Sequence, residues 1–456
     1  MSIFTNTTGL QFGAGNAFHD FLLTNYYRPV VADAVNNEVA LWSYLADRSD
    51  RMTGKSMVFP VHTAGNEGHS AIRPGGSMPD AKSQGANFYG IFARHLYGSA
   101  RIDGVTLDSD SLDGGSFANA EEFELNGLVN DIVREYNRIL NNDGSGRLGQ
   151  ADGGVSVTAV AAPGDTVTVK LNQGIAGASS STTPPTSSWL FRVGMRVGVI
   201  STTGTMKGVI EIESITNSTQ FVAHSTTGST VTIADNDWLV RASVDNPANS
   251  TSLAARGEPM GLEGIMSDLN VADGTGLVVN QSGVDNNLSA AGVGFQGIVS
   301  NAANAYNQCP VLSNGGVGRP LTEDLMQLAI SEAARRNNSF VNMIHSDYDQ
   351  WNNYASMLRP DKRYNNTTEL HGGQTVIDFN GVGWMRDRMA YANRIKFLGL
   401  ESAGFSRYTL ADMHYVNGAG WQGVPGEDAI YAILVHRWQC AVDVRERAGA
   451  HLVDLN

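Results

Sequence analysis

NAEEFELNGLVNDIVREYNRILNNDGSGRLG, residues 119–149, joins a helix pattern to a glycine-rich turn. Its apolar residues recur at the three- and four-residue spacing of one helix face. These residues are Leu125, Leu128, Val129, Ile132, Tyr136, Ile139 and Leu140. Asn119 is the expected N-cap, and Glu122 three residues later completes a capping box. The pattern predicts a long amphipathic helix over residues 119–140, followed by a turn.

The turn contains GSGRLG, residues 144–149, which matches the dinucleotide pattern G-x-G-x-x-G. That pattern requires a strand before it and a helix after it, so that the pyrophosphate meets the positive end of the helix. Here the helix comes first, and its negative end faces the glycines. Gly144 and Gly146 are therefore interpreted as residues that end the helix. Arg147 disfavours a calcium loop, and no cofactor, metal or catalytic residue is expected.

Before the helix, two strand-like stretches flank a segment rich in Gly, Pro and Ser. KSMVFPVHT (55–63) and NFYGIFARHLYGSARI (87–102) carry β-branched and aromatic residues. They predict a long hairpin within residues 51–102. A hairpin of this length cannot bury its own faces and needs a partner. The interface candidates at its tip are Arg73, Asp80 and Lys82.

The first 50 residues are expected to form an extended arm and one short helix. Residues 1–30 mix Gly, Asn, Thr and aromatic residues without a period. In residues 32–48, apolar residues follow one helix face. The apolar set is Val35, Val39, Trp42 and Leu45.

After the turn, residues 153–245 change character and favour β structure. Short stretches rich in Val, Thr and Ile alternate at period two and are separated by turn residues. This spacing is typical of a small β-barrel or sandwich. Basic and aromatic residues are not interleaved as in barrels that bind nucleic acid. We therefore expect an inserted surface or stabilising domain.

From residue 246 onward the pattern is mixed α/β. Helices are expected over residues 320–337, with Thr322 as N-cap, and over residues 346–360, capped by Ser346. Leu325, Leu328, Ala329 and Ala333 form the apolar face of the first of these helices. Residues 375–398 predict strands around tight turns, and residues 429–446 a closing pair of strands.

The composition excludes several classes of protein. The net charge is −14, which argues against a protein that mainly grips nucleic acid. Cys309 and Cys440 are the only cysteines, so a disulfide framework is excluded. No apolar run is long enough to span a membrane, and no secretory signal is expected. Hydrolase and P-loop signatures do not occur, and we expect a protein that is not an enzyme.

The order of these elements resembles a tailed-bacteriophage major capsid protein with the HK97-type fold. The hairpin resembles the extended E-loop of that family, helix 119–140 its spine helix, and FVNMIHSDYDQWNNYASML its axial strand and helix. The implied fold class is α+β, with the β-barrel as an insertion. The implied divisions are an N-terminal arm and short helix (1–50), the E-loop (51–102), a peripheral domain (103–152), the inserted barrel (153–245), an axial domain (246–374) and returning strands (375–456).

The resemblance implies a subunit that self-assembles into pentamers and hexamers of an icosahedral head around double-stranded DNA. It implies assembly in the host cytoplasm, and portal and decoration proteins as partners. No long charged helical segment precedes the arm, so a separate scaffolding protein is expected. Some members crosslink an E-loop lysine to a neighbouring subunit's asparagine, a role that Lys82 is placed to fill. A solvated charge is the simpler interpretation of Lys82.

Two alternatives remain open at the level of sequence. An encapsulin-like compartment shell shares the fold, although such chains are usually shorter and lack the inserted barrel. A carbohydrate-active enzyme with a β accessory domain would fit the acidic composition and the barrel. However, no two acidic residues stand in a recognisable catalytic pair.

Overall fold

The computed structural model describes most of the chain after the arm. It describes residues 41–42, 45–47, 56–106, 120–142, 144, 146–157, 167–171, 190–201, 206–217, 219–226, 230–241, 258–267, 298, 302–314, 317–335, 339–358, 367–370, 374–416 and 420–456. The predicted arm over residues 1–30 and most of the predicted helix over residues 32–48 therefore lie outside the described residues.

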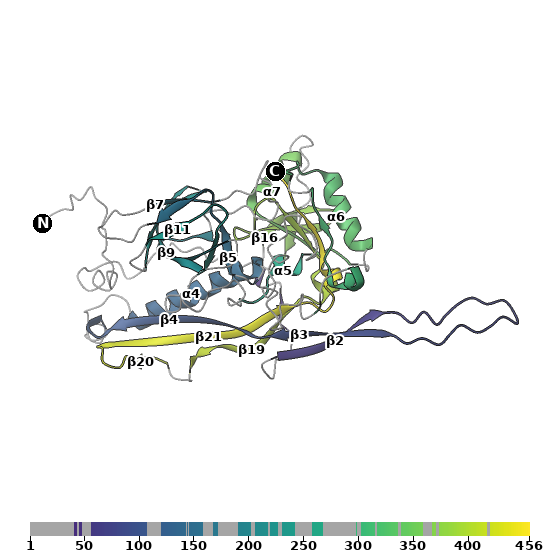
Figure 1. Ribbon diagram of the computed structural model, residues 1–456, viewed down its shortest axis with the longest axis horizontal. Helices are drawn as coiled ribbons and strands as arrows, with labels where there is room; N and C mark the ends of the chain where they lie inside the picture. The colour runs from purple at the N-terminus through teal and green to yellow at the C-terminus, as the bar shows by residue number, and fades with distance from the viewer. Residues whose placement is uncertain are drawn as a thin grey trace. The chain divides into compact units, whose positions relative to one another are not determined.

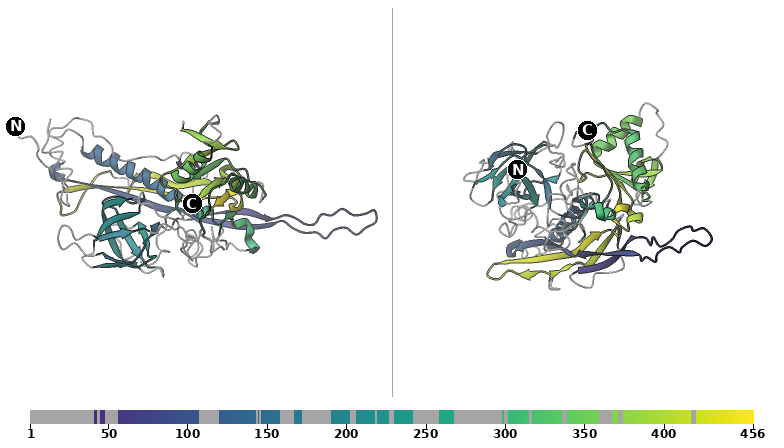
Figure 2. Two further views of the ribbon diagram at one scale, coloured as in Figure 1. Left: turned by 90° about the horizontal axis from the view of Figure 1, so that it is seen from above. Right: turned by 45° about the vertical axis from the view of Figure 1, so that its right-hand side comes forward.

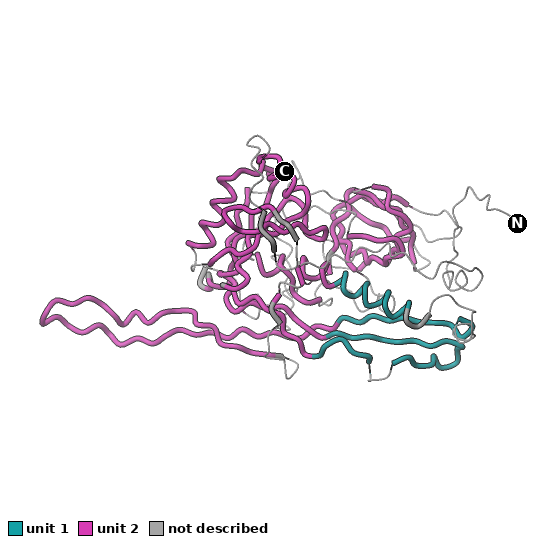
Figure 3. The backbone as a smooth tube through the Cα atoms, turned by 180° about the vertical axis from the view of Figure 1, so that it is seen from behind, with its two compact units in different colours: residues 1–39, 96–135, 411–436 teal, residues 40–95, 136–410, 437–456 magenta. Residues whose placement is uncertain are grey.

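The chain divides into two compact units (Figure 3). Unit 1 comprises residues 1–39, 96–135 and 411–436, and unit 2 comprises residues 40–95, 136–410 and 437–456. Several long elements contribute residues to both units because the chain passes from one to the other within them. These elements are β4 (Arg94–Asp103), α4 (Ala120–Asn141), β19 (Ser406–Tyr415) and β21 (Ala429–Ala441).

Helix α4 confirms the helix that the sequence pattern predicts. Within unit 1 its apolar face lies against β4 at Gly98, where a larger residue would have to displace two side chains of the helix. A Cβ atom there would lie 2.7 Å from Cδ1 of Ile132 and 2.9 Å from Cδ1 of Leu128. The predicted N-cap Asn119 lies outside the described residues.

The predicted hairpin is present in unit 2, but its second strand ends at Phe92, because residues 94–103 form the separate strand β4, which pairs with β21. β2 (Ser56–Ala64) pairs with β3 (Gly85–Phe92) from Ser56 opposite Phe92 to Ala64 opposite Gly85. Figures 1 and 2 show the segment between them extending away from the rest of unit 2. The tip thus stands clear of that unit's core.

The closing pair of strands predicted over residues 429–446 is wrong. One strand of 13 residues, β21, occupies this stretch, and the short helix η6 (Arg445–Ala448) follows it. β21 lies between β19 and β20 (Gln422–Gly423) and also pairs with β4, while β1 (Ala46–Asp47) extends the sheet beyond β19. No turn interrupts residues 429–441, so they form one strand, and β21 is rich in apolar residues because it has neighbouring strands on both sides.

The described residues of the stretch for which the sequence predicts an insertion form mainly strands. A six-stranded antiparallel sheet has the order β5-β12-β8-β9-β10-β7, and a two-stranded sheet pairs β11 with β6. Their bounds are β5 (Arg147–Gln150), β6 (Val155–Val157), β7 (Val167–Lys170), β8 (Arg196–Ile200), β9 (Met206–Asn217), β10 (Gln220–Ser225), β11 (Val231–Ile233) and β12 (Trp238–Arg241). A bridge between Ala151 and Leu171 joins the ends of the two edge strands. We call this part the β5–β12 region.

The β5–β12 region buries its own apolar core. Val197, Val199, Ile210 and Phe221 are among its fully buried side chains. Phe221 packs against Phe191 with ring centroids 5.0 Å apart. Alternation at period two places these residues on one face of the sheet.

A seven-stranded sheet forms the second large core of unit 2. Its order is β13-β22-β18-β14-β17-β16-β15. The strands are β13 (Val311–Leu312), β14 (Met343–Ser346), β15 (Thr367–Leu370), β16 (Gln374–Phe379), β17 (Val382–Arg386), β18 (Ile395–Leu398) and β22 (Gly449–Leu452). Asn380 and Gly381 have positive φ angles of 52° and 79° in the turn between β16 and β17. The strands predicted around tight turns over residues 375–398 are thus confirmed.

The two predicted helices pack against this sheet with small differences. In α6 (Glu323–Arg335), Thr322 Oγ1 accepts a hydrogen bond from Leu325 N at 3.2 Å, as an N-cap does. Met326 is buried in its apolar face, whereas Leu328 is 42% exposed. The predicted placement of Leu328 is therefore wrong.

The predicted cap of the second helix is also wrong by one residue. In α7 (Tyr348–Leu358), Asp347 Oδ1 accepts a hydrogen bond from Gln350 N at 3.0 Å and is the capping side chain. Ser346 belongs to β14, and its hydroxyl accepts a hydrogen bond from Trp384 Nε1 at 2.8 Å. Asp and Ser are equally good caps, so the sequence does not distinguish between these neighbours.

Candidate functional site

The ladder of β2 and β3 has one face on the core and one face in solvent. Phe59, Tyr89 and Ile91 lie on the inner face and pack into two apolar clusters of unit 2. On the outer face, Val58 is 64% and Phe88 is 63% exposed. Pro60 lies opposite Phe88 on that face and is also exposed. The outer face therefore presents apolar side chains that the described residues do not cover.

Polar contacts fix the root of the hairpin to unit 2. The buried Tyr89 hydroxyl donates to Asn307 Oδ1 at 2.9 Å, and Asn87 Nδ2 donates to the Tyr306 hydroxyl at 3.0 Å. Asn307 Nδ2 in turn donates to the carbonyl of Ile298 at 2.7 Å. The partners belong to or precede η3 (Ala302–Asn307). The hairpin is thus attached to unit 2 at its root.

The tip carries the three predicted interface residues on its surface. Arg73, Asp80 and Lys82 all have exposed side chains. The Arg73 carbonyl accepts a hydrogen bond from Gly76 N at 2.9 Å, which closes the terminal turn. Asn66 Nδ2 donates to the Lys82 carbonyl at 2.6 Å and so braces the two limbs of the tip.

Apolar side chains are exposed at the tip as well. Met78 is 83% and Ile72 is 44% exposed. Large apolar groups with this exposure lose contact with water when a partner covers them, which favours association. The tip and the outer face of the ladder therefore form one candidate contact surface of the hairpin.

The predicted glycine turn lies where α4 meets the β5–β12 region. Gly144 and Gly146 have φ angles of 79° and 74°, which favour glycine. Their carbonyls accept hydrogen bonds from Glu258 N at 3.0 Å and Arg241 N at 2.9 Å. Arg147 begins β5 opposite Val240. The structure thus places Gly144 and Gly146 just after the end of α4 and Arg147 at the start of β5.

A third glycine, Gly261, lies against the end of α4. A Cβ atom at Gly261 would lie 2.3 Å from the carbonyl oxygen of Ile139, 2.6 Å from that of Leu140 and 2.4 Å from that of Asn142. The backbone before α5 (Leu262–Ile265) therefore passes directly against the carbonyl end of α4. The sequence offers no sign of this contact, because Gly261 lies far from α4 in the chain.

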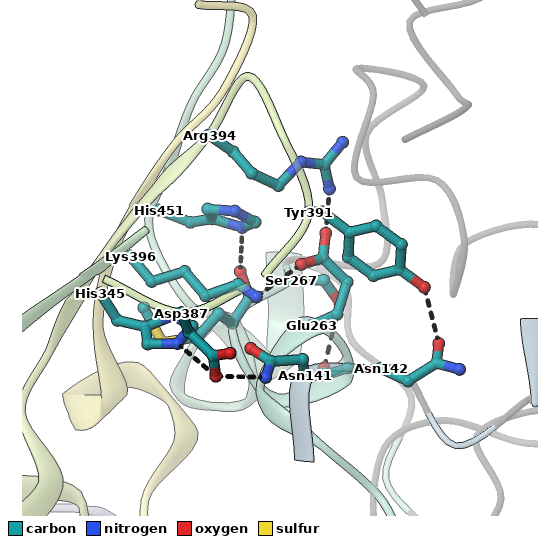
Figure 4. A network of polar contacts seen from close by, with 12 residues as sticks. Asn141, Asn142, Glu263, Ser267, His345, Asp387, Tyr391, Arg394, Lys396 and His451 are labelled. Carbon is teal, nitrogen blue, oxygen red and sulfur yellow. Dashed lines mark hydrogen bonds and ion pairs between the residues drawn. The ribbon is translucent and has the colours of Figure 1, made fainter. Parts of the chain in front are cut away.

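A row of polar side chains crosses three adjacent strands of the seven-stranded sheet. Lys396 on β18 lies opposite His345 on β14 and opposite His451 on β22. All three side chains are buried. Their strand neighbours Ile344, Phe397 and Ala450 point to the other face, into the apolar core with α6 and α7. We call His345, Lys396 and His451 the polar row (Figure 4).

Glu263 on α5 supplies the countercharge for the row. It is fully buried, forms an ion pair with Arg394, and lies 2.9 Å through Oε2 from Lys396 Nζ. Burial alone raises the pKa of Glu263, but the charges of Arg394 and Lys396 outweigh it and hold the pKa well below its ordinary value. Burial lowers the pKa of Lys396, and Glu263 opposes this.

Asp387 links the row to the end of α4. Its Oδ1 accepts hydrogen bonds from Asn137 Nδ2 at 3.0 Å and Met389 N at 2.8 Å, and its Oδ2 accepts one from Asn141 Nδ2 at 2.8 Å. His345 Nε2 donates to Oδ2 at 3.4 Å. Burial raises the pKa of Asp387, but the contact with His345, together with the hydrogen bonds from Met389 N and Asn141, outweighs it and the pKa is lowered. The hydrogen bonds of Asp387 thus hold the C-terminal turn of α4 to the seven-stranded sheet.

Two further contacts complete the attachment of α4 and α5. Tyr391 donates its hydroxyl hydrogen to Asn142 Oδ1 at 3.0 Å. The fully buried Arg445 donates to the carbonyls of Gly264 and Ile265 at 2.7 and 2.9 Å, and so satisfies the carbonyl end of α5.

The polar row and Glu263 are not among the residues that the sequence patterns single out. The sequence nevertheless contains a signal. The apolar strands IKFL (395–398) and GAHL (449–452) each contain one polar residue, Lys396 and His451. Within the described ranges, no helix is long and apolar enough to cross a membrane. In the same ranges, no group of three or more His, Cys, Asp or Glu side chains is placed to hold a metal ion.

Comparison with known proteins finds structural likeness at low sequence identity. No family model and no curated protein sequence matches the chain. A chain of the cyanophage A-1(L) capsid asymmetric unit matches with a TM-score of 0.50 and 11% identity, over 95% of this chain and 98% of that chain. A capsid chain of the empty GTA particle matches with a TM-score of 0.46 and 10% identity, over 97% and 99%.

An encapsulin is also similar in part. The holo-SrpI encapsulin complex from Synechococcus elongatus PCC 7942 matches with a TM-score of 0.26 and 14% identity, over 32% of this chain and 53% of that chain. A match of this size does not support the encapsulin alternative.

The likeness to the cyanophage capsid chain spans nearly the whole of both chains. It confirms the predicted fold class, an α+β fold of the HK97 type. Because the identity is only 11%, the comparison establishes the fold and no more.

Proposed function

We propose that this protein is a major capsid protein, the repeating subunit of an icosahedral shell that encloses phage double-stranded DNA. The observation that carries the proposal is the full-length likeness to the cyanophage capsid chain. The exposed hairpin supports it physically. A long two-stranded element with an apolar outer face gains stability only when something covers that face.

The partner that suits the hairpin best is another copy of the same chain. In a closed symmetric assembly, every copy presents the same surface and meets the same neighbour. Val58, Phe88 and Met78 would then be buried by the adjacent subunit. The net charge of −14 accords with a container that leaves packaged DNA largely unbound.

The test is to purify the full-length chain and examine it by size-exclusion chromatography and negative-stain microscopy. Rings or closed shells are expected, because capsomers are the units of such an assembly. A monodisperse 48.7 kDa monomer that turns over a small substrate would contradict the proposal.

The finer assignments belong to the same proposal. A separate scaffolding protein, a portal and decoration proteins are the expected partners, with assembly in the host cytoplasm and residence in the virion. Lys82, exposed at the hairpin tip, is expected to act as a solvated charge. SDS gels of boiled particles distinguish this from crosslinking, because uncrosslinked subunits give one band at 48.7 kDa.

A further inference from the structure

Each buried histidine of the polar row has one ring nitrogen engaged and one facing the interior. His451 Nδ1 donates to the Met266 carbonyl at 3.1 Å, and His345 Nε2 donates to Asp387 at 3.4 Å. A carbonyl and a carboxylate only accept hydrogen bonds, so these contacts assign the neutral tautomers. The other nitrogens, His451 Nε2 and His345 Nδ1, are buried and have no hydrogen-bond partner among the described residues.

The charges around the two histidines are balanced while both histidines are neutral. Glu263 faces them from α5, Asp387 and Arg394 face them from the chain between β17 and β18, and Lys396 lies between them on β18. These are two carboxylates and two cations, and Asn141 of α4 is neutral. The further charges on adjoining elements are the Arg138–Glu258 pair, at α4 and before α5, and Arg445 of η6.

Protonation of either histidine would add a positive charge and an unpaired N–H donor in the buried interior. A proton on His451 Nε2 creates a third cation beside Lys396 and Arg394, and the new N–H group has no acceptor among the described residues. A proton on His345 Nδ1 creates a second buried N–H group that also has no acceptor among the described residues. A buried charge or donor without a partner is costly unless water reaches it.

We propose that the polar row is an acid-operated joint, at which protonation of His451 and His345 separates α5 and the C-terminal turn of α4 from the seven-stranded sheet. The interactions that break are the ion pairs of Glu263 and the hydrogen bonds of Asp387, which hold these helices to the sheet. This device is additional to shell formation and belongs to the single subunit.

The direction of the pH dependence follows from the same groups. Burial lowers the pKa of His451 to about 3, and it also lowers the pKa of His345 although Asp387 opposes this. The open state therefore binds more protons below the ordinary histidine pKa of about 6.5. The closed state loses stability as the pH falls, by up to about tenfold per pH unit and histidine.

Hydrogen exchange of the full-length chain at pH 7 and pH 5, corrected for intrinsic rates, tests the joint. Amides of α5 and of the C-terminal turn of α4 should lose at least about tenfold in protection at pH 5. Amides of β8 and β9, in the separate core of the β5–β12 region, should not. Equal loss in the helices and in β8 and β9 would overturn the proposal.

Substitutions that retain the engaged donor but cannot be protonated give the matched variants. His451→Asn places an amide near the position of Nδ1, and His345→Gln places one near the position of Nε2. The double variant should keep its protection at pH 5, whereas His414→Asn, at an exposed histidine of β19, should behave as the parent. Acid opening that persists unchanged in the double variant refutes the joint. If the variant does not fold, the parent chain alone decides whether the joint exists, through the loss of protection in α5 and α4 compared with that in β8 and β9.

Discussion

At the scale of single residues, close packing and burial decide what this fold tolerates. Gly261 has no room for a side chain, and its neighbours are backbone carbonyls that cannot rotate away. Asp347 is only 7% exposed and caps α7. Its side-chain oxygen is needed for the cap, whereas burial disfavours its negative charge. These two positions yield predictions that can be checked without assembled particles.

Gly261→Ala should destabilise the chain by about 2–3 kcal/mol, because the end of α4 must move to admit a methyl group. Gly127→Ala is the matched control. Gly127 is exposed within α4 with nothing within 4 Å of a Cβ atom, and the same change should stabilise the helix by about 0.5–1 kcal/mol. Urea unfolding of both variants checks this, and equal midpoints would contradict it.

Asp347→Asn should stabilise the chain at pH 8 by up to about 4 kcal/mol. Burial raises the pKa of Asp347 to about 7, with a contribution from Asp349. The native state therefore favours the neutral acid, and its stability falls as the pH rises from about 4 through 7. Asparagine keeps the capping oxygen without the charge, so the gain should vanish near pH 4.

Asp347→Ala serves as the control for the cap itself. It removes the oxygen that Gln350 N donates to and should cost about 1 kcal/mol relative to Asp347→Asn at every pH. Thermal unfolding of the three proteins between pH 4 and pH 8 separates the two effects. A destabilised Asp347→Asn variant at pH 8 would refute the assigned cost of the carboxylate.

At the scale of elements, local patterns predict the structure wherever one face of an element is buried. The spacing of Leu128 and Ile132 predicts α4, and the β-branched and aromatic residues of 55–63 predict β2. The polar row is not predictable in this way. His345, Lys396 and His451 meet only through strand pairing between distant segments, and no local period encodes that register.

The candidate contact surface of the hairpin is predicted to be required for assembly but not for the stability of the monomer. Replacing both Val58 and Phe88 with Ser should leave the free energy of unfolding of the monomer within about 0.5 kcal/mol, since both side chains are exposed. Assembly should weaken, because each buried side chain of this size contributes about 1.5–3 kcal/mol. Particle yield at fixed protein concentration measures the effect.

Val193→Ser is the matched control for the hairpin variant. Val193 is 66% exposed, much as Val58 and Phe88 are, but lies in the β5–β12 region. Its substitution should leave both monomer stability and particle yield unchanged. Equal losses of yield in the two variants would show that exposed apolar area in general, and not the hairpin, drives assembly.

At the scale of the whole molecule, unit 2 contains two large cores built from different residues. The β5–β12 region buries Val197 and Phe221 in one, and the seven-stranded sheet buries Trp384 and Phe397 in the other. Tyr391 reaches the region through a small cluster with Ile200 and Trp238. A separate core and a small apolar contact to its surroundings accord with the inserted domain that the sequence predicts, which stays a prediction.

The geometry at the base of the β5–β12 region defines the deletion that tests this. Ala151 N donates to the Asp237 carbonyl at 2.9 Å, and Asn236 N donates to the Ala151 carbonyl at 3.0 Å. The chain therefore leaves and re-enters at adjacent points. A two-residue Asn-Gly turn in place of residues 152–235 should close the β5–β12 ladder without displacing α4.

The shortened chain should fold and still form rings or shells, because the seven-stranded sheet, the polar row and the hairpin all lie outside the deleted stretch. Its melting temperature is expected to fall by a few degrees, since Trp238 loses Ile200 as a neighbour. Circular dichroism and negative-stain microscopy measure the two outcomes. An aggregated or unfolded product would mean that the region completes the core of the subunit, and the insertion hypothesis would then be wrong.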